Sequence, residues 1–236
     1  MQTLDRIAAA SVALALLIVA GACIPYTVAT TARTAPVGER QRSMVIYAVQ
    51  NGIESKSDSI RSGASLPGYD LETRWGLDER TDIGVRFPSM SGVVMSYKRQ
   101  MTGIGAPDRR ATALMLGAGL VNLGQHGYLD ATFIASARER TTTPYGGVRL
   151  MQTIPLSSSA VADRPTIGAF FGARIGDSQT TISPELGIFY DHSALGLRSR
   201  EIVVVPAISV RNLHLPGVWR GLRAPRRPVI RPTFGR

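Results

Sequence analysis

The chain has 236 residues, a hydrophobic content of 44% and a formal net charge of +10. Charged residues make up 19%, below the ~25% that is typical of soluble domains. The positive charge lies mainly in the tail, because no acidic residue follows Glu201 and the net charge without the six arginines from Arg220 onward is +4. This tail lacks aromatic interleaving or a binding motif, so composition favours no nucleic-acid partner.

An apolar run lies close to the N-terminus. Residues 7–22 read IAAASVALALLIVAGA and follow Arg6. The run is shorter than the ~20 residues that a membrane-spanning helix needs. It is typical of the apolar core of a secretory signal, so we expect residues 1–22 to be a signal peptide.

The only cysteine, Cys23, follows directly in the sequence VAGAC. This sequence resembles the lipobox of bacterial lipoproteins, which implies cleavage before Cys23 and lipid modification of its thiol. Ile24 stands where aspartate would imply retention at the inner membrane, so the resemblance implies the outer membrane, with a lipid anchor at the N-terminus. The alternative is an ordinary signal peptide with an unrelated cysteine or a buried thiol. Residues 23–40, rich in Thr, Ala and Pro, are expected to be the lipidated N-terminus and a flexible tether.

The body of the chain, residues 41–214, is predicted to be a series of short strands. Polar connections of hairpin length, marked by Gly or Pro, separate apolar alternating runs and indicate an antiparallel up-and-down order. The candidate strands are Arg42–Asn51, Tyr69–Leu77, Thr81–Phe87, Gly92–Met101, Ala111–Val121, Tyr128–Arg138, Pro144–Gln152, Pro165–Ile175, Thr180–Asp191 and Glu201–Asn212. Ten strands, an even number, return both ends to one side and suit a small transmembrane β-barrel.

The strands carry an apolar face and a charged face. In GYDLETRWGL, Tyr69 and Leu71 alternate with Asp70 and Glu72, which is the period of a β-strand. We interpret the charged face as the inside of a narrow barrel, filled by salt bridges, with a narrow polar conduit as the alternative. The predicted lumen charges are Asp70, Glu72, Arg74, Asp82, Arg86, Lys98, Asp130, Arg138, Arg149, Arg174 and Glu185.

Two stretches carry a family resemblance. ETRWGLDERTDIGVRFPSMSGVVMSYKRQM resembles the hairpins of uncharacterised bacterial outer-membrane β-barrel proteins, and SPELGIFYD resembles their late strands. The resemblance spans about residues 68–212 and implies a fold and a location without an activity. A lipid-anchored periplasmic β-sandwich that binds a ligand or partner shows the same alternation and stays open. Pro184 and Pro206 lie inside predicted strands, where each removes a ladder donor and predicts a bulge or an edge.

The sequence favours no catalytic or metal site. Asp191, His192 and Ser193 are adjacent in YDHSALG, but neighbouring residues of a strand point to opposite faces and do not form a relay. A barrel-type lipid hydrolase that uses His192 is the enzymatic alternative. His126, His192 and His214 are scattered and have no ligand spacing with the single cysteine, so we expect no metal and no cofactor.

The last segment, residues 215–236, is rich in Arg and Pro and is predicted to be extended. It would contact anionic lipid or cell-wall polymer, or be a solvated end. The residues for that contact are Arg220, Arg223, Arg226, Arg227 and Arg231. Together these features predict an outer-membrane β-barrel lipoprotein in contact with membrane lipid, with a structural or adhesive role or a role in narrow solute passage.

Overall fold

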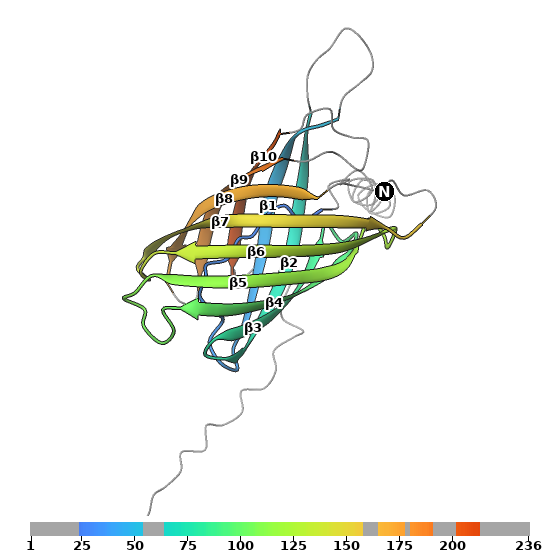
Figure 1. Cartoon of the computed structure of the whole chain (residues 1–236). Coiled ribbons are helices and arrows are strands. Elements are labelled where there is room, and N and C mark those ends of the chain that lie inside the picture. The colour runs from blue at the N-terminus through green and yellow to red at the C-terminus, as the bar shows by residue number, and fades with distance from the viewer. Residues whose placement is uncertain (1–23, 54–63, 158–164, 178–179, 191–201, 213–236) are drawn as a thin grey trace, which may run out of the picture.

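The structure is a computed structural model that describes residues 24–53, 64–157, 165–177, 180–190 and 202–212. These residues form a closed barrel of ten strands in the order β1-β10-β9-β8-β7-β6-β5-β4-β3-β2, and every neighbouring pair that forms the wall is antiparallel (Figure 1). The strands are β1 Arg40–Ile53, β2 Ala64–Asp78, β3 Thr81–Pro88, β4 Val93–Thr102, β5 Ala111–Val121, β6 His126–Ser136, β7 Thr142–Pro155, β8 Thr166–Gly176, β9 Thr181–Tyr190 and β10 Ile202–Arg211. The predicted all-β meander of about ten strands is confirmed, and closure excludes the β-sandwich.

Alternation along each strand builds the two faces of the wall. In β5, Ala113 and Met115 are buried inside the barrel while Leu114 and Leu116 are exposed outside. The β5–β6 ladder runs from Ala111↔Ser136 to Val121↔His126 without a register shift, so the same faces continue across both strands. Because a strand has a period of two, Asp130 of β6 turns inward, as do Asp70, Glu72 and Arg74 of β2, whereas Arg99 of β4 is exposed on the outer face.

Pro184 and Pro206, the two prolines predicted to be inside strands, lie at interruptions of the wall. The β8–β9 ladder has no pairs between Gly172↔Glu185 and Ile175↔Ile182, the interval that contains Pro184. The β1–β10 ladder has five pairs and stops at Tyr47↔Ala207, one residue before Pro206. Proline has no amide donor, and here it accompanies a broken ladder where the sequence predicted a bulge or an edge.

The barrel has two distinct ends. The terminus end contains Arg40, Arg211 and the connections 79–80, 103–110, 137–141 and 177–180. The loop end contains the described connections 89–92 and 122–125, and at this end the sequence between β1 and β2, β7 and β8, and β9 and β10 is 10, 10 and 11 residues long. Within the described residues, no helix is long and apolar enough to cross a bilayer.

Residues 24–36, which we name the lumen segment, run through the inside of the barrel (Figure 1). Ile24 packs with Val49 and Val121 near the loop end, and Thr34 donates to the Glu79 carbonyl at the terminus end. The tether predicted for residues 23–40 is therefore wrong for residues 24–36. The reason is that the barrel wall supplies hydrogen-bond partners for this main chain, so it need not remain solvated.

The apolar core lies between the lumen segment and the wall. Tyr26 contacts Phe189 edge to face with ring centroids 5.3 Å apart, among Tyr47, Tyr128 and other buried side chains. A second cluster nearer the terminus end places Val28 and Ala32 against β5, β6, β7 and β8. Several predictions fall outside the described residues: the signal peptide, Cys23, the triplet Asp191–Ser193, His214 and the arginine tail.

Candidate functional site in the barrel lumen

The predicted lumen charges lie inside the barrel with one exception. Ten are buried, five acidic and five basic, and their side chains converge from β2, β3, β4, β6, β7, β8 and β9. Arg138 is exposed, and its prediction as a lumen residue is wrong. Strand β6 ends at Ser136, two residues before the predicted end, so Arg138 belongs to the connection to β7 and no longer follows the alternation.

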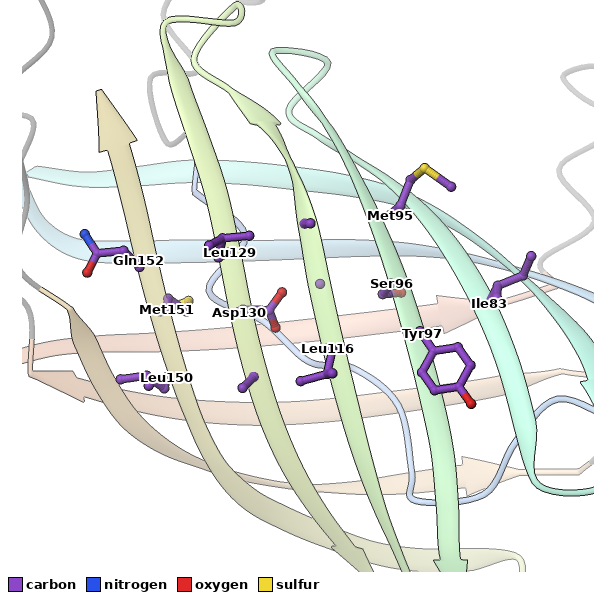
Figure 2. A pocket seen from close by; sticks show the side chains of 13 residues that line it. Ile83, Met95, Ser96, Tyr97, Leu116, Leu129, Asp130, Leu150, Met151 and Gln152 are labelled. Carbon is purple, nitrogen blue, oxygen red and sulfur yellow. The ribbon is translucent and has the colours of Figure 1, made fainter. Parts of the chain in front are cut away.

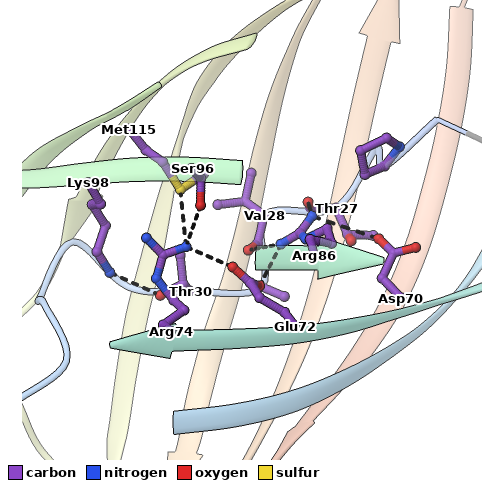
Figure 3. Close-up of polar contacts among 12 residues, drawn as sticks. Thr27, Val28, Thr30, Asp70, Glu72, Arg74, Arg86, Ser96, Lys98 and Met115 are labelled. Atoms are coloured by element: carbon purple, nitrogen blue, oxygen red, sulfur yellow. Dashed lines mark hydrogen bonds and ion pairs between the residues drawn. The ribbon is translucent and has the colours of Figure 1, made fainter. Parts of the chain in front are cut away.

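The largest ionic cluster joins β2, β3 and β4. Arg74 donates to Glu72 at 2.7 Å (Figure 3). Arg74 also pairs with Asp82, which in turn lies 3.2 Å from the Lys98 ammonium. Arg86 donates to the other oxygen of Glu72 at 2.8 Å and lies 3.7 Å from Asp70. The free-energy cost of burying these charges is offset by ion pairing, because every member of the cluster lies near an opposite charge.

Glycine makes room for this cluster in the wall. A Cβ added to Gly84 would lie 2.8 Å from both the Arg74 guanidinium and the Ser96 hydroxyl. One added to Gly117 would lie 1.9 Å from Asp130 Oδ1. At these two positions the absence of a side chain therefore leaves space for Arg74 and for Asp130.

Among the described residues, three further ion pairs lie along the wall and at the terminus end. Arg149 donates to Asp130 and contacts the Tyr128 hydroxyl at 3.0 Å. At the terminus end, Arg174 donates to Glu139 at 2.5 Å, and Glu139 also pairs with Arg33 of the lumen segment at 3.5 Å. The ionic contacts thus extend from the middle of the barrel to this end.

Wall cations donate to the carbonyl oxygens of the lumen segment. Arg149 donates to Pro25 at 2.7 Å and to Thr27 at 2.9 Å. Arg86 donates to Thr27 and to Val28. Lumen cations therefore have two kinds of acceptor, a wall carboxylate and a main-chain carbonyl.

Wall carboxylates accept from the amides of the same segment. Glu185 accepts from Val28 at 2.8 Å and from Ala29 at 2.7 Å, and it also accepts from the Tyr145 hydroxyl at 2.9 Å. Such charge-assisted bonds to main-chain N–H groups are about twice as strong as neutral ones. Glu185 is therefore a peptide-binding residue here, in addition to being a lumen charge.

The C-terminal part of the lumen segment, residues 31–35, is also held by charged side chains of the wall. The Lys98 ammonium donates to the carbonyls of Thr31 and Arg33 at 3.3 and 2.7 Å, and Asp82 accepts from the Ala35 amide at 2.9 Å. Arg33 then donates to four carbonyls of the β4–β5 connection, those of Gly103, Ala106, Pro107 and Arg109.

The lumen segment is the part of the site that sequence reasoning missed. Residues 24–36 have no alternating pattern, and their Thr, Ala and Pro content is also typical of a linker. The small and medium-sized side chains of residues 27–32 are the one signal that fits the observed position, because the lumen around them is narrow. Arg33 was also missed, because it lies in this segment and outside any alternating run.

Other candidate chemistry is sparse in the described part of the chain. No group of three or more His, Cys, Asp or Glu side chains suitable for a metal ion occurs there. His126 is buried at the start of β6, and its Nδ1 lies 3.4 Å from the Asn122 amide nitrogen. His192, the residue of the hydrolase alternative, lies outside the described residues.

The outer wall is apolar, and it holds a shallow hollow over β3 to β7 (Figure 2). Ile83, Met95, Leu116, Leu129 and Leu150 line this hollow from the outside. Exposed apolar side chains occur on every strand, and examples are Ile46, Leu77, Phe87, Met95, Leu116, Phe133, Leu150, Phe171, Ile188 and Ile208. The polarity of the barrel is the reverse of that of a soluble protein.

No known protein family and no curated protein matches the sequence. The chain is similar in structure to an outer membrane channel from Pseudomonas putida F1, with 12% identity, 78% of this chain and 98% of that chain covered, and a TM-score of 0.49. It is also similar to Neisserial surface protein A, with 12% identity, coverage of 73% and 94%, and a TM-score of 0.34. For Ail of Yersinia pestis the identity is 11%, the coverage is 74% and 97%, and the TM-score is 0.32. At such low identity no residue role can be transferred from these proteins.

Proposed function

We propose that the chain is an outer-membrane β-barrel lipoprotein with a closed lumen and a structural role in the cell envelope. The observation that carries this proposal is the reversed polarity of the barrel, apolar outside and ionic inside. Exposed apolar surface on this scale is stable against acyl chains and unfavourable in water.

Strand length and connectivity support a membrane-spanning position. A tilted spanning strand needs about 9–11 residues, and strands such as β5 and β6 have 11. Barrels of this type have short periplasmic turns and longer outer loops. We therefore assign the terminus end to the periplasm and the loop end to the outer side.

The filled lumen favours a structural role over free solute passage. The lumen segment and the ion pairs of Arg74, Arg86 and Arg149 occupy the interior. Passage of a solute would require displacement of this segment. An adhesive role through the outer loops remains compatible with a closed barrel, and the arrangement needs no catalytic chemistry.

Two parts of the proposal concern segments outside the described residues. Lipidation of Cys23 would fasten the chain at the residue directly before Ile24, the start of the lumen segment. The tail arginines would contact anionic lipid or cell-wall polymer from the periplasm. Mass analysis of the mature N-terminus tests the lipid, and binding of the tail peptide to anionic vesicles tests the contact.

Fractionation tests the membrane position itself. The variant Cys23→Ser, exported behind a cleavable signal peptide in place of residues 1–22, has no lipid anchor. We expect it to stay in the outer membrane, to resist carbonate extraction and to show heat-modifiable gel mobility. Release of the folded variant into the soluble fraction would contradict the proposal.

Conductance recording tests closure separately. The wild-type protein reconstituted in planar bilayers should give no steady conductance. A stable open pore formed by the untreated protein would show that the lumen is not closed at rest.

A further inference from the structure

We propose that the lumen wall is a binding site for a polypeptide main chain, and that residues 24–36 are its resident, separable ligand. This inference rests on the proposed closed membrane barrel and adds the class of ligand that the lumen accepts. It also predicts that the barrel becomes a polar conduit when this ligand leaves.

The wall recognises main-chain atoms. Arg86, Arg149 and Lys98 donate to five carbonyl groups of residues 25–33. Glu185 and Asp82 accept from three amides of residues 28–35. Charges of both signs thus contact the carbonyl and amide groups of the segment, and Glu185 alone accepts from the two successive amides of Val28 and Ala29.

The ligand class follows from the side chains that the lumen admits. The central residues of the segment are Thr, Val and Ala, and all of residues 27–32 are buried. A ring is accepted at the loop end, where Tyr26 packs on Phe189. Arg33 fits the terminus end, where loop carbonyls receive it. The site therefore takes a small-residue peptide with an aromatic leading residue and a basic trailing residue.

The segment is held apart from the barrel ladders. Residues 24–36 have no strand pairing and are held by side chains of the wall. Before β1 begins, the main chain pairs with β2 at the bridge Val37↔Gly76 and through hydrogen bonds of Gly38 and Glu39 with Gly76. Residues 36–39, which join the segment to β1, are exposed. The ligand can consequently leave without loss of any ladder that closes the wall.

Departure of the segment would uncover a charged passage. Arg86 and Arg149 would lose carbonyl acceptors, and Glu185 would lose both amide donors. Groups of this kind regain partners only from water or solutes, because unpaired buried charges are costly. The emptied lumen would therefore be hydrated and able to conduct small ions.

The test separates the segment after the barrel has folded. A protease recognition sequence replaces the exposed stretch Val37–Glu39 in the full chain, and the purified, folded protein is cut in detergent and washed with mild denaturant. Before washing, the fragment should comigrate with the barrel in size-exclusion chromatography. After washing, bilayers should show ion conductance that the uncut protein lacks.

A synthetic peptide of residues 24–36 should then bind and abolish the conductance. The matched control is the same peptide with N-methyl groups on Val28 and Ala29, which removes both donors to Glu185. Loss of charge-assisted bonds of this kind predicts at least about tenfold weaker binding. The variant Glu185→Gln should weaken binding of the unmodified peptide in the same direction.

The outcomes distinguish this inference from the proposed function. A washed barrel that stays closed, or equal binding of both peptides, would overturn the peptide site while heat-modifiable mobility still supports a membrane barrel. Anisotropy of a labelled peptide in detergent measures binding without a bilayer. Peptide binding with no insertion into vesicles would support the site and contradict the membrane role.

Discussion

Arg74 shows how one side chain couples strands across the lumen. It lies between Glu72 of its own strand and Asp82 of β3, and both carboxylates are almost completely buried. Such a pair adds little net stability compared with apolar packing, yet loss of one partner leaves an uncompensated charge. Arg74 therefore adds little net stability, but its removal would leave Glu72 and Asp82 without their shared cation.

The substitution Arg74→Met should lower the free energy of unfolding by about 3–5 kcal/mol, because Glu72 and Asp82 lose their shared cation. The matched control is Arg138→Met, whose side chain is exposed in the β6–β7 connection and should change stability by less than about 0.5 kcal/mol. Guanidinium unfolding of both variants in lipid vesicles makes the comparison. Equal losses in the two variants would contradict the observed burial.

Gly117 is constrained by a single neighbour. The substitution Gly117→Ala would force Asp130 away from Arg149, and we expect a cost of about 1–3 kcal/mol. In an Asp130→Ala background the same change should cost much less, since the clashing oxygen is gone. A double-mutant cycle from unfolding curves measures this coupling, and strict additivity of the two changes would contradict the contact.

Alternation predicted the strands because it is a local property. Every strand from β1 to β10 lies where a period-two run predicted it, with ends that differ by a few residues. Strand ends depend on turns, which explains Arg138: the Ala137 amide donates to the Pro144 carbonyl and β6 stops before it. Ten of the eleven residues predicted as lumen charges are buried, because the period of two decides which face of the wall a strand residue occupies.

The lumen segment could not be predicted because its conformation is set by distant residues. Val28 and Glu185 are 157 positions apart, and Pro25 and Arg149 are 124 apart. No local pattern in residues 24–36 contains that information. Ala29 illustrates the point, since its φ of 53° is unusual for a residue other than glycine and is maintained by contacts with the wall.

The seam between the first and last strands is the element on which closure depends. Ile46 and Ile208 face each other on the outer surface, at a pair of the five-pair β1–β10 ladder. In a Cys23→Ser background, Ile46→Cys with Ile208→Cys should form a disulfide, because Cβ atoms of directly paired residues lie within bonding reach.

The control pair is Ile46→Cys with Ser209→Cys, in which the second thiol points into the lumen. Nonreducing gels of oxidised protein, folded in vesicles, should show the crosslink in the first pair alone. Crosslinking in neither pair would mean that β1 and β10 do not meet in this register.

At the scale of the whole molecule, the two faces of the wall differ in polarity and therefore suit different surroundings. On the inside, the ion pairs of Arg74, Arg86 and Arg149 supply charges with partners from the chain itself. The outside offers apolar side chains on every strand, which suit the proposed hydrocarbon environment. A closed barrel meets both conditions because its ring of paired strands leaves few strand edges unpaired.

Placement of a charge on the outer face distinguishes a bilayer from water around the barrel. Leu116 lies at the middle of β5 and is 48% exposed, whereas Leu123 lies in the β5–β6 turn and is 81% exposed. In water, Leu116→Arg would be neutral or favourable because it removes exposed apolar surface. In a bilayer it should cost about 2–4 kcal/mol, while Leu123→Arg near the interface should cost about 0–1 kcal/mol. Folding yield in vesicles, read from heat-modifiable mobility, should fall for Leu116→Arg alone, and both variants should fold in detergent, where a charged side chain can reach water.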